Sequence, residues 1–330
     1  MKICVYGAGA IGGHIAARLA KGGAETSVVA RGPHLSAIRA SGLTVVAHDG
    51  TLHSRPRATD NPAELGPQDA VIVTVKAPAL PSVAAAIAPL LGSETAVAFV
   101  MNGIPWWYFD GTAKAGRRLP ELDPGDALRA AIGVGRTIGG VVYSAASVTE
   151  PGVIHAIAPD SRVVLGELDG AMTPRLKALC DTIAAGGIGA PAVPDIRNAV
   201  WAKLLGNLMT GPLCVLSRSC MEDTLASPAV RETAIRMARE VMAIAAALGC
   251  PIAGDAPEAR IGRSSKLRHK PSILQDLEAG RAMEIDALFA APLTLAREAG
   301  VAVPMLETMT ALATRAAIAA GLYTPKGVAA

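Results

Sequence analysis

The stretch that decides the fold comes first, KICVYGAGAIGGHIAARLAK at residues 2–21. Residues 2–6 are mostly apolar and include β-branched side chains, which predicts a buried strand. Apolar side chains recur at helical spacing over residues 11–21, which predicts a helix. A strand, a glycine-rich turn and a helix in this order predict the first unit of a parallel α/β sheet.

The turn carries Gly7, Gly9 and Gly12 in the spacing G-x-G-x-x-G. In such a unit the first glycine permits the tight turn, the second lets a pyrophosphate approach the backbone, and the third lets the helix pack closely on the strand. The start of the helix, at Ala10 and Ile11, supplies N–H groups for the phosphates. A glycine-rich turn without a ligand is the alternative, because the pattern alone is weak. The strand and the helix that flank it favour dinucleotide binding.

The end of the second predicted strand, residues 25–30, bears on the choice of cofactor. Proteins that bind NAD place an acidic residue there, where it binds the 2′-hydroxyl of the ribose. This sequence has Arg31 instead. A guanidinium at this point suits a 2′-phosphate, so the predicted cofactor is NADP(H), with a solvated strand-end arginine as the alternative.

Two later runs, residues 70–75 and 96–101, are apolar in the way of strands buried in parallel sheets. Each is followed by a polar residue, Lys76 or Asn102. Ligands bind at the carboxyl ends of strands in such sheets, so both are candidate site residues, although a lysine there is often only solvated. Further strands are predicted within residues 131–143 and 162–165.

A Gly/Pro-rich stretch, GGIGAPAVPD at residues 186–195, predicts a domain boundary. The pattern beyond it is almost wholly helical. We therefore predict an α/β protein, with a Rossmann-like dinucleotide-binding domain over residues 1–194 and an all-helical domain over residues 195–330.

Composition narrows the class of protein. The formal net charge of +3 is evenly spread, which disfavours nucleic acid and anionic membranes as partners. No apolar stretch of membrane-spanning length is free of charges. The five cysteines are scattered, without the spacing of a metal site or a disulfide framework. These features predict a soluble cytoplasmic protein with reduced thiols and no bound metal.

Two polar residues stand in an otherwise apolar helical segment, DIRNAVWAKLLGNLMTGPL at residues 195–213. Lys203 and Asn207 are four residues apart, so they share one face of the helix. Lys203 either extends its ammonium group to the surface or faces a cavity, and the pattern does not decide between the two.

A second helix is predicted over residues 271–293, PSILQDLEAGRAMEIDALFAAPL, with Glu284 on a stripe of apolar residues. Charged side chains are rarely buried without a partner, so Glu284 needs one, and Lys203 is the obvious candidate. Ser272 and Gln275 have the spacing of a capping box at the start of this helix. Such a cap still places a hydroxyl and N–H groups where a carboxylate could bind.

Together these segments resemble the ketopantoate reductases (2-dehydropantoate 2-reductases), and the resemblance covers nearly the whole chain. It implies an NADPH-dependent oxidoreductase of pantothenate biosynthesis that acts on CH–OH groups and reduces 2-dehydropantoate to pantoate. The shared features are GAGAIGG, Arg31, VTVK ending in Lys76, Asn102-Gly103, AKLLGN with Lys203 and Asn207, and SILQDLEAGRAMEID with Ser272 and Glu284.

The resemblance implies that a hydride passes from the nicotinamide to the keto carbon of a 2-oxo acid. Lys203 would be the general acid that gives a proton to the developing alkoxide. Glu284 would help to keep Lys203 charged against the effect of burial, and would orient the substrate.

The other residues implied by the resemblance bind rather than react. Asn102 and Ser272 would bind the carboxylate end of the substrate, and Asn207 a substrate hydroxyl. Lys76 would lie beside the cofactor, and Asn102 would also contact it. The implied partners are NADP(H) and a small 2-oxo acid, and a homodimer is compatible with the sequence.

Two features depart from the family pattern. The family commonly has a second asparagine four residues after the one at Asn207, where this chain has Gly211. An insertion, residues 105–126, contains four consecutive aromatic residues at 106–109. This run could be a packing cluster or a lid over the substrate. The departures leave open a related reductase or dehydrogenase of a bulkier 2-oxo or 2-hydroxy acid, or a non-catalytic NADP sensor.

Overall fold

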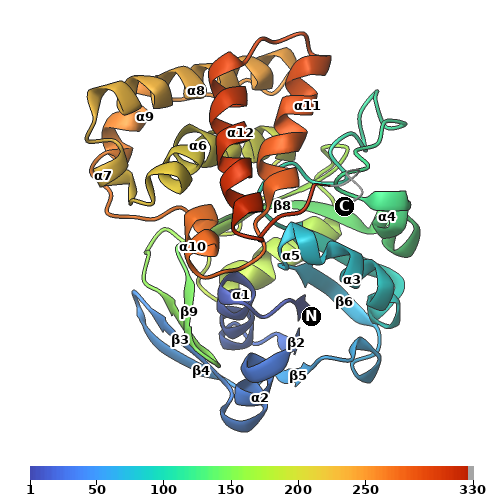
Figure 1. Cartoon of the computed structure of the whole chain (residues 1–330). Helices are drawn as coiled ribbons and strands as arrows, with labels where there is room; N and C mark the ends of the chain where they lie inside the picture. Colours follow the sequence, from blue (N-terminus) through green and yellow to red (C-terminus); the bar gives the residue numbers. More distant parts are fainter. Residues whose placement is uncertain (326–330) are drawn as a thin grey trace. The chain divides into compact units, whose positions relative to one another are not determined.

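The structure is a computed structural model that describes residues 1–325 and divides into two units (Figure 1). The first unit comprises Met1–Met101 and Trp106–Ile196, and the second comprises Asn102–Pro105 and the chain from Arg197 onward. Two β-sheets and their helices form the first unit, and the described residues of the second contain helices without strands. This arrangement confirms the predicted fold class, an α/β part followed by a helical part.

The main sheet of the first unit has seven strands in the order β11-β8-β7-β6-β1-β2-β5. Neighbouring strands are parallel except for β11 and β8. The chain moves outward from β1 to β2 and β5, and then crosses to β6 on the other side of β1. The carboxyl ends of β1 and β6 therefore form the switch point where ligands bind in such sheets. The strands are β1 (Lys2–Tyr6), β2 (Glu25–Val29), β5 (Arg57–Thr59), β6 (Gln68–Val73), β7 (Leu91–Val100), β8 (Thr137–Tyr143) and β11 (Arg162–Glu167).

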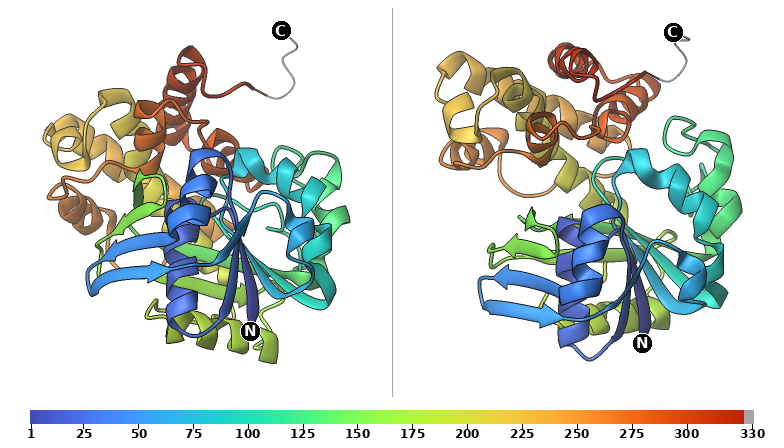
Figure 2. Two further views of the ribbon diagram at one scale, coloured as in Figure 1. Left: turned by 90° about the horizontal axis from the view of Figure 1, so that it is seen from below. Right: turned by 60° about the horizontal axis from the view of Figure 1, so that its bottom comes forward.

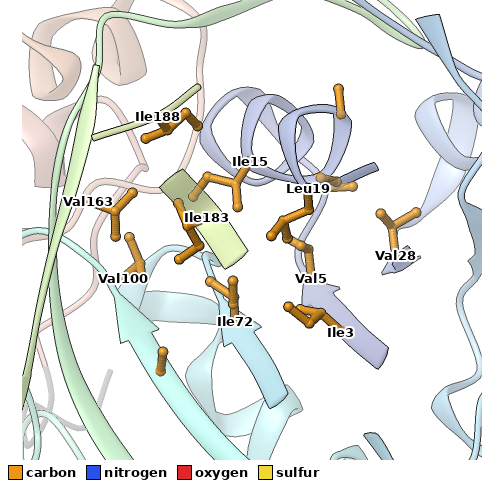
Figure 3. Close-up of a cluster of buried hydrophobic side chains, with 14 of the residues drawn as sticks. Ile3, Val5, Ile15, Leu19, Val28, Ile72, Val100, Val163, Ile183 and Ile188 are labelled. Atoms are coloured by element: carbon orange, nitrogen blue, oxygen red, sulfur yellow. The ribbon is translucent and has the colours of Figure 1, made fainter. Parts of the chain in front are cut away.

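Helices α1 and α5 pack side by side on this sheet, and their apolar side chains form its core (Figure 3). Ile15 of α1 and Ile183 of α5 belong to one cluster with Ile3 and Ile72 of the strands, and all four are at most 2% exposed. Burying a side chain of this size stabilises the fold by about 1.5–3 kcal/mol. Side chains on the other face, such as Val71, are buried as well, which explains why the strands are unbroken apolar runs. The helices of this unit are α1 (Ala10–Lys21), α2 (Gly32–Ser41), α3 (Leu80–Ala86), α4 (Ala127–Ile132) and α5 (Pro174–Ala185).

The aromatic run at residues 106–109 packs inside the first unit. All four of its side chains are buried. Trp106 meets Phe99 of β7 edge to face, with ring centroids 5.5 Å apart. The following residue, Asp110, accepts two bonds from the guanidinium of Arg129 on α4, at 2.8 and 2.7 Å. The run is therefore a packing cluster that anchors the insertion to the sheet and to α4.

A second sheet, which the sequence patterns did not predict, has the order β4-β3-β10-β9 and lies beside α1 (Figure 2). Helix α1 packs on it so closely that a Cβ on Gly13 would lie 2.2 Å from the Cδ1 of Ile154. Strands β4 and β9 are mostly exposed, so they lack the apolar runs that reveal the main strands. The strands are β3 (Leu43–Ala47), β4 (Gly50–Ser54), β9 (Ser147–Glu150) and β10 (Val153–Ala156).

The strand predicted within residues 131–143 is correct only in its second half. Ala127–Ile132 forms α4, and Gly133, with a φ of +82°, ends that helix. Thr137–Tyr143 then forms β8. The residues before Gly133 are rich in alanine, and those after it include β-branched side chains. The strand pattern therefore applies only to the second part of the segment.

In the second unit, α8 packs against α9, α11 and α12. Glu240 of α8 accepts bonds from the N–H groups of Met305 and Leu306, at 3.1 and 2.7 Å, which satisfies the N-terminus of α12. Among the described residues, α6 is long and apolar enough to cross a membrane by length and composition, but 67% of its apolar window is buried, as in a core helix. The helices are α6 (Ile196–Ser217), α7 (Met221–Thr224), α8 (Pro228–Ala247), α9 (Pro257–Ser264), α10 (Ser272–Glu278), α11 (Ala291–Glu298) and α12 (Pro304–Ala319).

The single helix predicted over residues 271–293 is wrong. Helix α10 ends at Glu278, and Gly280 has a φ of +62°. A left-handed residue stops an α-helix, and glycine adopts this conformation readily. A π-helical turn, η6 (Asp286–Ala290), then leads into α11. Glu284 therefore lies in an irregular segment and not on a continuous helical stripe.

An ion pair between a buried arginine and an exposed aspartate fixes α1 to the hairpin of β3 and β4. Arg18 of α1 is 2% exposed and donates two bonds to Asp49, at 2.7 and 2.5 Å. The Arg18 guanidinium holds the pKa of Asp49 well below its usual range. Burial lowers the pKa of His14 to about 4, so this histidine stays neutral and accepts a bond from Arg18 Nε at 3.3 Å.

We expect Asp49→Ala to lower the free energy of unfolding by about 1–3 kcal/mol, because it leaves the buried Arg18 guanidinium without its main acceptor. Asp60→Ala is the control: it removes an exposed pair with Arg39 and should cost less than about 1 kcal/mol. Because the folded protein lowers the pKa of Asp49, the extra stability of the wild type should be present at neutral pH and decline as the pH falls below 3.8. Denaturant titrations at several pH values measure this, and equal losses in the two variants would contradict it.

Candidate functional site

The glycine-rich turn lies at the switch point of the main sheet, between β1 and α1. Gly7 has a φ of +103°, a conformation that side chains disfavour. The N–H groups of Gly7 and Ala8 both donate to the carbonyl of Val29 in β2, at 2.9 and 3.1 Å. A Cβ on Gly7 would lie 2.5 Å from Val75 Cγ1. The turn is thus held between the end of β2 and the residues that follow β6.

Gly12 and Gly9 have opposite surroundings. A Cβ on Gly12 would lie 2.1 Å from the carbonyl oxygen of Gly7 and 2.3 Å from Thr74 Oγ1, so α1 meets the turn at a distance that only glycine permits. A Cβ on Gly9 would have no neighbouring atom within 4 Å, and Gly9 is exposed. This contrast matches the requirements of a dinucleotide site, in which one glycine packs and another leaves room for phosphate.

The start of α1, at Ala10 and Ile11, carries no side-chain cap and no acidic residue in its first turn. The first N–H groups of a helix and the positive end of its dipole attract anions. Together with the open space at Gly9, this end of α1 suits a pyrophosphate.

Thr74 is a site residue that the sequence patterns missed. Its Oγ1 donates to the carbonyl oxygen of Gly7 at 2.7 Å. A threonine at the end of an apolar run gives no signal of its own. Its position becomes significant only because β6 lies next to β1 in the sheet.

Arg31 lies just beyond β2 and occupies the N-cap position of α2. The residue is exposed. Because β1 and β2 are parallel neighbours, Arg31 and the glycine-rich turn share one edge of the sheet. Burial raises the pKa of Tyr6, the last residue of β1, and the positive charge of Arg31 opposes that rise. The guanidinium is therefore within electrostatic reach of the strand that leads into the turn.

Lys76 lies three residues beyond β6, at the N-cap position of a short 3₁₀ segment, and is half-buried. It belongs to the same edge of the sheet as the glycine-rich turn, as predicted from the strand pattern. Asn102, in contrast, belongs to the second unit, together with Gly103, Ile104 and Pro105.

Lys203 and Asn207 mark the accessible stripe of α6. Both are half-buried, as are Ala199, Ala202 and Gly206, whereas most of the helix is buried. Lys203 neither lies fully in solvent nor is fully enclosed. Burial lowers the pKa of His269, and the positive charge of Lys203 lowers it further. The ammonium group of Lys203 is therefore within electrostatic reach of the segment that precedes α10.

Asn102 and Glu284 are brought onto adjoining backbone within the second unit. The N–H of Ile104 donates to the carbonyl of Ala287 at 2.9 Å, and a Cβ on Gly103 would lie 2.6 Å from that same carbonyl. The carbonyl of Glu284 accepts a bond from the N–H of Leu288, so Glu284 lies on the turn that the 102–105 segment contacts.

Glu284 is 6% exposed, and the buried position of a carboxylate requires compensation by polar groups. Arg281, the nearest arginine in the sequence, donates from its Nε to Asp276 at 3.0 Å. Glu284 lies beside the Asn102 segment, so it remains a candidate site residue.

Ser272 begins α10, but the predicted capping box does not form. The N-cap residue is Pro271, which has no side-chain bond to the helix, and Gln275 Nε2 donates to the carbonyl of Lys270 at 2.8 Å. The helix starts one residue earlier than the capping pattern requires, so Ser272 is its first residue instead of its N-cap, and it is exposed.

Gly211 does not open a pocket. A Cβ at this position would make an ordinary contact with Ile273 Cγ2 at 3.4 Å, and Ile273 is itself buried. The contact also joins α6 to α10 one residue from Ser272. The accessible stripe of α6 therefore ends at Asn207.

One group of potential metal ligands occurs in residues 1–325: Cys220, Glu222 and Asp223, whose ligand atoms lie within 4.8 Å of one another. Cys220 Sγ donates to Asp223 at 3.1 Å, which accounts for the proximity of two of them. None of the three belongs to the residues predicted to bind cofactor or substrate.

Comparison with known proteins identifies the family of this chain. The sequence profile described as Ketopantoate reductase PanE/ApbA matches residues 3–170, and the profile described as Ketopantoate reductase PanE/ApbA C terminal matches residues 195–317. The chain belongs to the ketopantoate reductase family. Ketopantoate reductases are NAD(P)-dependent oxidoreductases that act on CH–OH groups, so the resemblance noted in the sequence is confirmed.

Three relatives show how much of the chain the family covers. A protein named 2-dehydropantoate 2-reductase, from Mesorhizobium japonicum, is 42% identical over 98% of this chain and 100% of its own length. A crystal structure from Ralstonia solanacearum MolK2 is 39% identical with a TM-score of 0.90, over 98% of this chain and 99% of that one. The ternary structure of D-mandelate dehydrogenase with NADH and anilino(oxo)acetate is 21% identical with a TM-score of 0.81, over 98% and 100%, and shows the same fold.

The two glycines should separate cofactor binding from folding. We expect Gly9→Ala to leave the melting temperature nearly unchanged, because its φ of −69° suits alanine and no atom lies near, but to weaken dinucleotide binding by roughly tenfold or more. Gly12→Ala should lower both the melting temperature and the affinity for the dinucleotide, because its methyl group would clash with the Gly7 carbonyl. Thermal melts and fluorescence titrations with NADPH measure the two effects. Normal binding by Gly9→Ala would place the phosphates elsewhere.

Proposed function

We propose that this protein reduces 2-dehydropantoate (ketopantoate) to pantoate with NADPH, as a cytoplasmic enzyme of pantothenate biosynthesis. The observation that carries the proposal is the match over nearly the whole chain to a protein named 2-dehydropantoate 2-reductase. Two features support it: the open, glycine-rich turn at the start of α1 in the first unit, and the contact of the Asn102 segment with the turn after Glu284 in the second.

The bound cofactor supplies a hydride, which adds to the keto carbon of the substrate. The carbonyl oxygen gains negative charge as the new C–H bond forms, and it needs a proton. Lys203, as an ammonium group on the accessible stripe of α6, donates that proton and becomes neutral. The products are a 2-hydroxy acid and the oxidised cofactor, and solvent reprotonates Lys203.

Glu284 favours the ammonium form of Lys203, because a buried carboxylate stabilises a nearby positive charge. The same carboxylate helps to orient the substrate hydroxyl groups. Asn102 and Ser272 bind the substrate carboxylate, and Asn207, one helical turn from Lys203, binds the distal hydroxyl.

NADPH is the preferred cofactor in this proposal because Arg31 stands at the sheet edge beside the turn. The fold alone does not decide between NADPH and NADH, since D-mandelate dehydrogenase has the same fold and was solved with NADH. The feature that supports NADPH is the exposed guanidinium of Arg31, which can pair with a 2′-phosphate through two N–H groups. Lys76 adds a second positive charge at the same edge.

The two sequence features that suggested a bulkier acid have structural explanations. The aromatic residues at 106–109 are buried in the first unit. Gly211 is buried, and a Cβ there would contact Ile273 of α10. The proposal therefore keeps ketopantoate as the substrate.

Turnover of ketopantoate tests the proposal directly. The wild type should oxidise NADPH with ketopantoate faster than with other 2-oxo acids at equal concentration. Lys203→Ala should lower kcat by roughly 10²-fold or more with little change in the dissociation constant of NADPH. Lys177→Ala, which removes an exposed lysine of α5 paired with Asp181, is the control. If Lys203→Ala keeps its turnover, another group provides the proton, and if another 2-oxo acid is preferred, the substrate is wrong.

Arg31→Ala should weaken NADPH binding by roughly tenfold, about 1.4 kcal/mol, and leave NADH binding nearly unchanged, because only NADPH has the 2′-phosphate. Arg39→Ala on the same helix is the control, since Arg39 is engaged with Ala58 and Asp60. Fluorescence titrations with both cofactors measure the effect. Equal losses for the two cofactors would mean that Arg31 only supports the fold.

A further inference from the structure

Two carbonyl oxygens of the glycine-rich turn are bound by side chains from distant segments. Thr74 Oγ1 donates to the carbonyl of Gly7 at 2.7 Å. His34 Nε2, from α2, lies 2.6 Å from the carbonyl of Ala8. Neither His34 nor Thr74 has a part in the mechanism described above, yet each reaches into the turn that faces the cofactor phosphates.

The partners of His34 define its state. The N–H of Gly152, in the turn between β9 and β10, donates to His34 Nδ1 at 3.0 Å. Nδ1 is therefore the unprotonated nitrogen, and Nε2 carries the hydrogen that it donates to Ala8. Both ring nitrogens are used, and the neutral ring joins α2, the glycine-rich turn and the second sheet.

The orientation of these carbonyls matters because glycines flank them. Gly7 and Gly9 have no Cβ to restrict rotation, so the peptide planes between them can turn at little steric cost. If the Ala8 carbonyl turned toward the start of α1, its partial negative charge would oppose a phosphate there. The N–H of Gly9 donates to the Gly7 carbonyl at 2.8 Å and holds the same peptide plane from its other end.

We propose that His34, together with Thr74, is a positioning residue of the dinucleotide site: the two side chains hold the carbonyls of the turn away from the phosphates. The inference rests on the proposed NADPH site. His34 lies three residues after Arg31 at the start of α2, so its bond to Ala8 also fixes the backbone that carries Arg31 relative to the turn. The pyrophosphate and the 2′-phosphate are then bound at a set separation.

Two pairs of variants test this proposal. His34→Leu and Thr74→Val remove the donors at similar size, whereas His34→Gln and Thr74→Ser keep groups that can make the same bonds. We expect the first two to weaken NADPH binding by roughly three- to tenfold each, and the second two to stay within about twofold of the wild type. The KM for NADPH should rise more than kcat falls. His155→Leu, at an exposed position of β10, is the matched histidine control.

The outcomes separate this inference from the proposed function. If the wild type binds no NADPH, the cofactor site itself is wrong. If the wild type binds but His34→Leu and Thr74→Val bind equally well, the positioning role is overturned. It is also overturned if His34→Gln and Thr74→Ser lose as much affinity as the first pair, because the bonds then do not matter. Thermal melts of all five variants show whether any loss follows unfolding, and a fall in melting temperature without a change in affinity counts against the proposal.

Discussion

The first unit depends on the close approach between α1 and the glycine-rich turn. At Gly12 the helix meets the Gly7 carbonyl and the Thr74 hydroxyl with no room for a methyl group. At its other end α1 is fixed by the pair of the buried Arg18 and Asp49. A helix held at both ends keeps its N-terminus at one place on the sheet edge, and this is the requirement for binding a phosphate through backbone N–H groups.

The second unit holds the buried carboxylate of Glu284 on a segment without regular helix. Helix α10 ends at Glu278, and Gly280 has a φ of +62°. The 102–105 segment contacts the turn that follows, since the N–H of Ile104 donates to the carbonyl of Ala287. The residues that follow α12 also contact the irregular segment, since the N–H of Met283 donates to the carbonyl of Leu322, and the hydroxyl of Tyr323 donates to Asp286 at 2.5 Å.

The sequence predicted those features that depend on local patterns. The strand, the turn and the helix of residues 2–21 are found as expected, because the chemistry of each lies within a few neighbouring residues. The break at Gly280 was missed because a glycine inside an apolar pattern indicates either a gap in packing or a stop, and only the left-handed φ decides. The pattern of Ser272 and Gln275 fits a capping box, yet the helix begins elsewhere.

Other features could not be predicted because they arise between segments far apart in the sequence. Asn102 follows a strand of the first unit but belongs to the second, owing to the bond between Ile104 and Ala287. The second sheet pairs β3 with β10, more than a hundred residues later, and its outer strands are exposed and short. Sequence periodicity reports which face of an element is buried but not what covers it.

Gly211 shows why a missing polar residue needs structural analysis before it is read as a missing substrate contact. In the sequence, glycine at this position implies an empty space beside Lys203 and Asn207. In the structure, Ile273 fills the direction in which a side chain would point, and both residues are buried. Position 211 therefore contributes to the contact between α6 and α10. A methyl group there would meet Ile273 at the ordinary contact distance of 3.4 Å, so this glycine is a packing position between two helices as well as a departure from the family pattern.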